Sequence, residues 1–260
     1  MLNSAHPQLQ KLYAGDIYKC SATQASFELI EEVEARWAAH FGPSISDVHR
    51  NNKNDTILFK LSQIRAALFG PTVIALQKKL ISQLSIFESE FLVDTLRLRA
   101  YTPQMLTLPE AEPCYYAHRD TWYGNPQHQI NCWIPLRNYN SSESFCFYPQ
   151  YFQHPVVNDS HLFNYEQWVK QVGWQSTNPK NKGVYPKAIM GNKEQQMRFE
   201  CRRGEIILFS GQHLHQSLSQ SGVQTRVSVD FRVVPMANQQ MIQPRNVDNF
   251  SVGTTRGDFV

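Results

Sequence analysis

Two histidines and one aspartate carry the most informative chemistry in this sequence. His118 and Asp120 stand two residues apart, and His215 follows far downstream. In a β-strand, residues i and i+2 project to the same side, so His118 and Asp120 can present an imidazole and a carboxylate to one point. Two imidazoles and one carboxylate on one face form the facial triad that holds Fe(II) and leaves coordination positions open. The geometry suits oxygen activation.

The pair of His118 and Asp120 is weak evidence when it is taken alone. Two polar residues two positions apart on a strand also occur as a surface pair or as a hydrogen-bonded core histidine. His213 competes with His215 for the third position, because both histidines have the same strand parity. The residues alone leave this choice open; if His215 is the third ligand, His213 would support the site or the structure around it.

A row of polar residues on a downstream strand strengthens the case for a site. Arg226 lies eleven residues beyond His215 and opens the predicted strand 226–234. One face of this strand carries Val227, Val229, Phe231 and Val233, and the other face carries Arg226, Ser228, Asp230 and Arg232. A charged row on a central strand needs a reason. An arginine that meets the far carboxylate of a dicarboxylic cosubstrate in a bidentate pair would provide one.

The elements that must position these residues change character along the chain. Residues 1–90 predict a helical layer, since apolar residues recur at helical spacing over 27–41, 57–68 and 71–84. Strands then dominate; the candidates are 91–101, 115–118, 129–136, 145–148, 197–202, 205–210 and 226–234. This order predicts a single domain that is mainly β with supporting helices: a jelly roll, or double-stranded β-helix of cupin-like type, over 91–235.

Two segments depart from the strand pattern. Residues 151–196 are rich in Asn, Lys and Pro, contain a short helical pattern over 162–172, and predict a lid-like insertion between core strands. Residues 236–260 form a C-terminal tail.

Composition sets limits on the partners. The 260 residues are 42% hydrophobic and 18% charged, which indicates a folded domain. The net charge is +3 and no basic run exceeds two residues, so we expect no nucleic-acid groove. The longest apolar runs have four residues, far below the roughly 20 of a spanning helix, so we expect no membrane segment. The five cysteines are widely spread and form no CxxC pair, so we expect them to be reduced thiols. We also expect a cytoplasmic protein whose partner is a small molecule. The oligomeric state is not predicted.

These motifs resemble the phytanoyl-CoA dioxygenase-like branch of the Fe(II)/2-oxoglutarate-dependent oxygenases, which includes ectoine hydroxylases and natural-product tailoring enzymes. The resemblance covers about residues 101–234 and is carried by three pieces: His118-x-Asp120, the stretch from Phe209-x-Gly211 to Leu214-His215-x-Ser217, and Arg226. It implies a double-stranded β-helix with N-terminal helices, in agreement with the order of elements above.

The resemblance also implies roles for single residues. His118, Asp120 and His215 would bind iron, and Arg226 would hold the C5 carboxylate of 2-oxoglutarate. The resemblance also places Ser217 and Trp133 near the cosubstrate, and a basic residue, Arg97 or Arg99, would complete the cosubstrate pocket. Two further sets come from position in the sequence: Ser228 has inward parity on its strand, and Tyr116, Trp122 and Tyr123 flank the triad and would line a substrate pocket. The segment 145–155 lacks the usual small-residue turn, so the substrate pocket lies beyond family analogy.

The sequence therefore predicts an enzyme that uses Fe(II), 2-oxoglutarate and O2 to oxidise a small polar metabolite, with release of succinate and CO2. Hydroxylation, demethylation, fragmentation and desaturation remain open as outcomes. Because Asp120 is present where related halogenases have a small residue, chlorination is not expected. Two alternatives remain: a cupin-like metalloprotein that does not use 2-oxoglutarate, and a non-catalytic binding or sensor module on the same fold.

Overall fold

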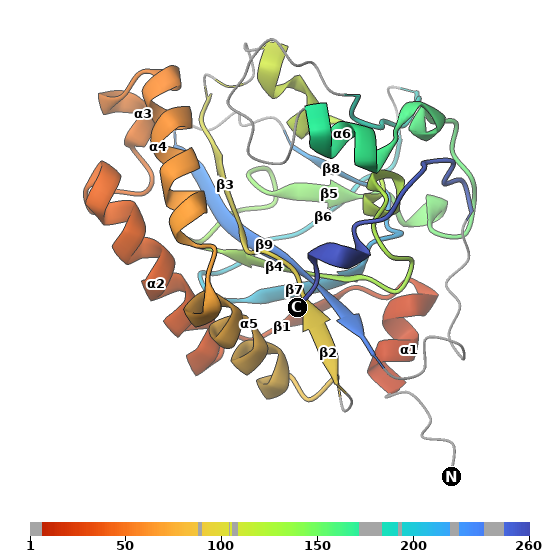
Figure 1. The fold of residues 1–260 in the computed structure, drawn as a ribbon, viewed down its shortest axis with the longest axis horizontal. Coiled ribbons are helices and arrows are strands. Elements are labelled where there is room, and N and C mark those ends of the chain that lie inside the picture. Colours follow the sequence, from red (N-terminus) through yellow and green to blue (C-terminus); the bar gives the residue numbers. More distant parts are fainter. Residues whose placement is uncertain are drawn as a thin grey trace.

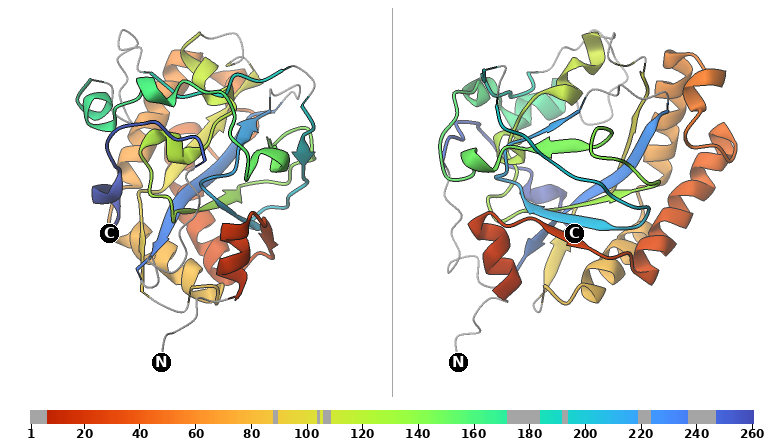
Figure 2. Two further views of the ribbon diagram at one scale, coloured as in Figure 1. Left: turned by 90° about the vertical axis from the view of Figure 1, so that its right-hand side faces the viewer. Right: turned by 180° about the vertical axis from the view of Figure 1, so that it is seen from behind.

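A layer of helices covers one face of a large β-sheet, and a smaller sheet lies on the other side (Figures 1 and 2). The computed structural model describes residues 7–87, 90–103, 105, 109–171, 184–191, 194–218, 224–236 and 247–260. Its helices are α1 (Pro7–Ala14), α2 (Gln24–Phe41), α3 (Val48–Asn51), α4 (Asn54–Ala67), α5 (Pro71–Gln83) and α6 (Tyr165–Gln171). Short 3-10 turns include η2 (Pro109–Tyr115), η3 (Asp120–Tyr123) and η6 (Arg256–Asp258).

The large sheet is antiparallel and has six strands. Its strands are β1 (Tyr18–Cys20), β2 (Phe91–Val93), β3 (Arg97–Tyr101), β4 (Ile130–Pro135), β7 (Ile206–Ser210) and β9 (Arg226–Pro235). They lie in the order β1-β7-β4-β9-β2, with β3 also paired to β9. The small sheet has the order β6-β5-β8 and consists of β5 (Phe145–Phe147), β6 (Met197–Arg198) and β8 (His215–Ser217).

Successive segments of the chain alternate between the two sheets. After β3 in the large sheet, His118 forms a bridge to His215 at the edge of the small sheet. The chain then passes through β4 (large), β5 and β6 (small), β7 (large), β8 (small) and β9 (large). This wrapping of antiparallel strands into two facing sheets is the double-stranded β-helix, or jelly roll, that the sequence predicts.

The helical layer forms where the sequence predicts helices, because each has an apolar stripe and clear end signals. At the start of α2, the Thr23 hydroxyl accepts the Ser26 backbone N–H at 3.1 Å and the Ser26 hydroxyl accepts that of Thr23 at 2.9 Å. Pro71 occupies the first turn of α5, where its missing N–H costs no hydrogen bond. Taken singly, none of the described helices is long and apolar enough to cross a membrane; α4 and α5 together, bent by 77°, satisfy length and composition only.

The large sheet has an apolar face and a polar face, and this division positions the site. Val227, Val229, Phe231 and Val233 of β9 are fully buried in one core cluster with the stripes of α2, α4 and α5. Because side chains alternate along a strand, Arg226, Ser228, Asp230 and Arg232 face the opposite side. All four line one cavity. The predicted assignment of alternate residues of β9 to an apolar face and a polar face is confirmed.

Several predicted elements are wrong in detail. The predicted strand 91–101 is broken into β2 and β3, and residues 115–118 form no strand beyond the single bridge at His118. The predicted helical layer also contains β1, which pairs with β7 and extends the large sheet. Only two residues of the predicted strand 197–202 pair as β6. These segments depend on partners distant in sequence, which local periodicity does not reveal.

The insertion and the C-terminal segment are described in part. The short helix predicted within the insertion is α6. Residues 172–183 and 192–193 lie outside the described residues, so a lid over 151–196 stays a prediction. Residues 247–260 pack against the core, since Val260 and Val93 exchange backbone hydrogen bonds of 2.9 and 3.0 Å and Thr255 donates its N–H to the Gly124 carbonyl. This end of the chain is therefore part of the domain.

Candidate metal centre

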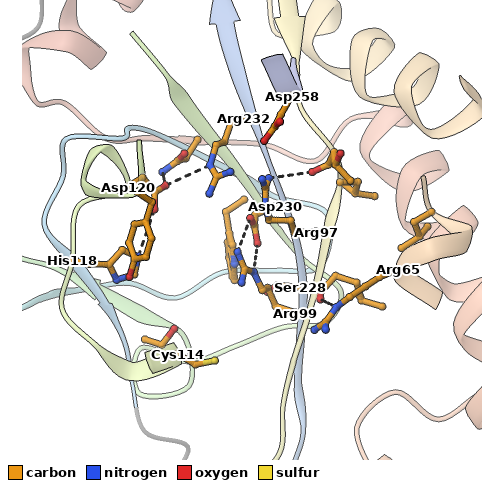
Figure 3. Close-up of a pocket in the computed structure, with 18 of the residues that line it drawn as sticks. Arg65, Arg97, Arg99, Cys114, His118, Asp120, Ser228, Asp230, Arg232 and Asp258 are labelled. Carbon is orange, nitrogen blue, oxygen red and sulfur yellow. Dashed lines mark hydrogen bonds and ion pairs between the residues drawn. The ribbon is translucent and has the colours of Figure 1, made fainter. Parts of the chain in front are cut away.

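His118, Asp120 and His215 lie together in the space between the two sheets. Each offers one ligand atom, and these atoms lie within 4.8 Å of one another. The Nε2 atoms of His118 and His215 are 3.5 and 3.9 Å from Asp120 Oδ1. Both imidazoles and the carboxylate line a cavity of about 750 Å³, which is within the usual range for small-molecule sites. Figure 3 shows His118 and Asp120 on one side of this cavity and the arginines of β9 and β3 on the other. The three residues that the sequence singled out thus converge on one point.

Backbone carbonyls orient the two imidazoles. The Nδ1 atoms of His118 and His215 lie 2.9 and 3.0 Å from the carbonyl oxygens of Tyr116 and His213. A carbonyl can only accept, so each Nδ1 carries the proton and each Nε2 presents a lone pair toward Asp120. Burial, followed by the neighbouring His118, lowers the pKa of His215 to about 4. A neutral imidazole with Nε2 free is the form that binds a divalent metal.

Amide side chains orient the Asp120 carboxylate. Its Oδ2 accepts hydrogen bonds from Asn131 Nδ2 at 2.6 Å and Gln129 Nε2 at 3.2 Å, so Oδ1 faces the histidines. Burial alone would raise the pKa of Asp120, but His118 and His215, when they are protonated, and the permanent charge of Arg232 outweigh burial and hold the pKa well below its usual range. The residues present therefore fit a divalent metal in both geometry and protonation.

The route by which Asp120 reaches the site differs from the prediction. Asp120 begins the 3-10 turn η3, and only His118 is paired as in a strand. The His118–His215 bridge aligns two distant backbones, with N–H to carbonyl distances of 2.9 and 3.0 Å. This bridge, and not a continuous strand, brings the first and last members of the cluster together.

His213 and His215 diverge although their sequence parity is the same. Strand β8 begins at His215, and His213 lies in the preceding turn. The imidazole of His213 is fully buried among Phe147, Phe152 and Phe209, with ring centroids 5.4, 4.5 and 6.3 Å away. Its backbone carbonyl lies 3.0 Å from His215 Nδ1, which agrees with the supporting place that the sequence suggests.

Arg226 lies in the same cavity in a constrained conformation. Its guanidinium donates to the Ser144 carbonyl and, at 3.1 Å, to the Ser217 hydroxyl, and lies over the Tyr101 ring at 4.3 Å. Among the described residues, Arg226 Nε and the hydroxyl of the fully buried Ser228 have no partner. Buried polar atoms normally have partners, so these two unsatisfied groups fit a ligand such as a carboxylate. Trp133, Ser217 and Ser228 all line this cavity.

A network of charges extends from Arg226 along β9 and β3. Arg99 donates to Asp230 through Nε at 2.8 Å and Nη2 at 3.4 Å. Asp94 accepts from Arg97 at 2.6 Å and from Arg232 at 3.0 Å. Arg97 and Arg99, between which the sequence could not choose, both line the cavity and each already has a carboxylate partner.

The three aromatic residues predicted to line the substrate pocket have different surroundings. Tyr123 lines the cavity and its ring contacts His118 edge-on at 5.1 Å. Trp122 is fully buried in a separate apolar cluster and donates its Nε1–H to Asp248 at 2.9 Å. Tyr116 is half-buried beneath the Lys187 ammonium, 4.7 Å from its ring. Neither Trp122 nor Tyr116 lines the cavity.

Sequence reasoning missed the residues that support the ligands. Gln129 and Asn131 could have been noticed, since two amides at i and i+2 interrupt an apolar strand and must share one face. Arg119 had no such signal. It is buried, pairs with Asp248 at 3.0 Å and donates to the carbonyls of Gln212, Tyr151 and His154. It thereby ties the loop of His118 and Asp120 to the loop before His215.

Comparisons with known proteins found solved structures that have a limited similarity to this chain. No protein-family model and no curated protein matches the sequence. The chain is similar to the non-heme alpha-ketoglutarate-dependent epimerase SnoN from nogalamycin biosynthesis, with TM-score 0.43 and 12% identity over 88% of this chain and 83% of that chain. It is also similar to the non-heme monooxygenase ThoJ, with TM-score 0.49 and 10% identity over 87% and 77%. A third similar structure is apo HygX from Streptomyces hygroscopicus, with TM-score 0.46 and 12% identity over 88% of this chain and 86% of that chain. Likeness at this level assigns no activity to the chain.

Proposed function

We propose that this protein is an Fe(II)- and 2-oxoglutarate-dependent dioxygenase that oxidises a small polar metabolite. The observation that carries the proposal is the convergence of His118, Asp120 and His215 within 4.8 Å in a cavity that also contains Arg226 and the Ser228 hydroxyl, which has no hydrogen-bond partner in the described part of the chain. Two imidazoles and one carboxylate are typical of non-heme Fe(II) oxygenases. SnoN has been solved in complex with Fe3+ and alpha-ketoglutarate and HygX with iron bound, which is in keeping with this proposal.

In this proposal one set of side chains binds the metal and another set binds the cosubstrate. His118, Asp120 and His215 would hold the metal, and the carbonyls of Tyr116 and His213 keep both imidazoles in the ligating tautomer. Arg226 and Ser228 would bind the far carboxylate of 2-oxoglutarate. Bound iron and 2-oxoglutarate would supply the oxidising chemistry, with succinate and CO2 as coproducts.

The remaining cavity residues bind and position the substrate. Tyr123 stands beside His118 and forms a wall next to the metal ligands. We expect C–H oxidation, with hydroxylation, demethylation, fragmentation and desaturation as its forms, because placement of the substrate above the metal decides among them.

The direct test is anaerobic addition of Fe(II) and 2-oxoglutarate to metal-free protein. We expect a visible charge-transfer band from the chelate, and its loss in His118→Ala, Asp120→Ala and His215→Ala. His161→Ala, which removes an exposed imidazole, is the matched control and should keep the band.

The outcomes separate the proposal from its two alternatives. Metal binding without a band would favour a metalloprotein that does not use 2-oxoglutarate. A band without succinate release under oxygen, with or without candidate substrates, would favour a binding or sensor module. Succinate release that increases with a substrate supports the dioxygenase.

A further inference from the structure

The cavity that contains the metal ligands is lined by more positive than negative side chains. Its described lining includes five arginines and three aspartates, and contains neither lysine nor glutamate. The arginines are Arg65, Arg97, Arg99, Arg226 and Arg232, and the aspartates are Asp120, Asp230 and Asp258. Metal binding would use Asp120, and cosubstrate binding would use Arg226. The other charges remain to be explained.

Most of these charges already have partners. Arg97 and Arg232 share Asp94, which lies behind the cavity wall, and Arg99 pairs with Asp230. Asp258 accepts the hydroxyl of Tyr165. The carboxylates that face the cavity are thus engaged, so a cationic ligand would have to displace an existing bond.

Arg65 and Arg226 are the two of these arginines that have no carboxylate partner among the described residues, and of the two only Arg65 has no role in the proposed cosubstrate site. Arg65 extends from α4 to β3, where its Nε donates to the Leu98 carbonyl at 3.0 Å (Figure 3). No described residue accepts from its Nη atoms, and neither Nη is sealed from solvent. Burial, followed by the positive charge of Arg99, lowers the pKa of Arg65. Two guanidinium groups that repel each other in a cavity wall create a place that an anion would stabilise.

Arg99 can share such an anion. Asp230 uses Nε and Nη2 of Arg99, which leaves Nη1 without a described partner. The Arg99 side chain is 36% exposed, so it remains accessible from the cavity despite this ion pair. Arg65 and Arg99 come from different elements, α4 and β3, and both are held by hydrogen bonds at one end of the guanidinium. Their free ends are therefore oriented before any ligand arrives.

We infer that the substrate of this site carries an oxyanion group, a carboxylate or a phosphate, which binds to Arg65 and Arg99 while the rest of the molecule lies toward the metal ligands. This inference rests on the proposed function for the reaction, but the anion site is defined by the arginines alone. Aromatic residues, including Tyr123, Tyr165 and Trp168, line another part of the cavity wall and suit a ring or an apolar body.

The test uses full-length protein loaded with inert Zn(II) and 2-oxoglutarate, titrated with small aromatic probes and followed by ligand-observed NMR. The probes are phenylacetate, phenyl phosphate, the neutral phenylacetamide and the cation phenethylammonium. We expect at least one anion to bind about tenfold more tightly than the amide, as one charge-assisted hydrogen bond provides. The stronger of the two anions identifies carboxylate or phosphate as the preferred group.

Variants assign the binding to Arg65. Arg65→Gln should weaken the preferred anion about tenfold, and Arg65→Lys should recover part of that loss. Lys78→Gln, which removes an exposed charge from α5 outside the cavity, is the matched control and should bind as the unmodified protein does. Unchanged circular dichroism of Arg65→Gln shows that its fold is intact.

Three results would overturn the inference: equal binding of the amide, tighter binding of the cation, or an Arg65→Gln affinity equal to that of Lys78→Gln. Probe binding that is seen only in a parallel titration without 2-oxoglutarate would also overturn it, because the probe would then occupy the cosubstrate position. Failure of the proposed function is a separate result, since it appears as absence of the Fe(II)/2-oxoglutarate band whatever the probes do.

Discussion

The buried ion pair between Arg119 and Asp248 allows a quantitative prediction about support of the metal centre. The two side chains are 2% and 3% exposed, and their Nε and Oδ1 atoms are 3.0 Å apart. The Asp248 carboxylate also accepts the Trp122 Nε1–H and the Val156 N–H, each at 2.9 Å. Asp248→Asn keeps the size of the side chain but leaves the Arg119 charge without a counterion in a dry environment.

Breaking one partner of a buried pair typically costs 3–5 kcal/mol, and the amide oxygen of Asn retains part of the hydrogen bonding, so we expect a loss of about 3 kcal/mol. For a domain of this size that loss lowers Tm by roughly 6–12 °C. Because Arg119 separates the ligands His118 and Asp120, we also expect metal affinity to fall by about 10- to 100-fold, as for other residues that orient metal ligands.

The assay compares thermal unfolding and Co(II) titration of Asp248→Asn with those of Glu34→Gln. Glu34 pairs with Arg203 at 2.8 Å, but these side chains are 31% and 36% exposed, so the same carboxylate-to-amide change should cost about 0–1 kcal/mol. If the two variants unfold at the same temperature, the Arg119 pair does not stabilise the site as argued. If only stability falls and Co(II) affinity is unchanged, its link to the metal ligands is wrong.

Three further outcomes are expected. Arg226→Gln should weaken 2-oxoglutarate binding by about 10- to 100-fold in a titration of the visible band, because the variant loses a charge-assisted pair with the cosubstrate. Its metal affinity should stay the same, since no metal ligand is removed. Unchanged cosubstrate affinity would contradict the assignment of Arg226. His213→Phe should retain metal binding, since only the carbonyl of residue 213 reaches His215; loss of Co(II) binding in a folded variant would show that the imidazole matters. The unmodified protein should give no chlorinated product by mass spectrometry with chloride present, because Asp120 would occupy the coordination position that chloride needs, and Asp120→Gly is the variant in which halogenation would be sought.

The sequence by itself determined the types of residue at the site and the parity of its best strand. Alternation over 226–234 assigns Arg226, Ser228, Asp230 and Arg232 to one face, and β9 has this arrangement, because the two-residue period is a property of extended backbone at any position. Helical spacing likewise located α2, α4 and α5, whose stripes pack against the sheet. These inferences are local, so they needed no knowledge of the partner segments.

Only the tertiary structure decided how these residues meet. His213 and His215 have equal parity in sequence, and they diverge because β8 starts at His215, where pairing with His118 and with β5 begins. Arg65 lies on a helix predicted only to pack, and it joins the cavity because α4 lies against β3. Asp248 reaches Arg119 across most of the chain. Such contacts are set by burial and strand pairing between distant segments, and short-range patterns of residue type do not contain that information.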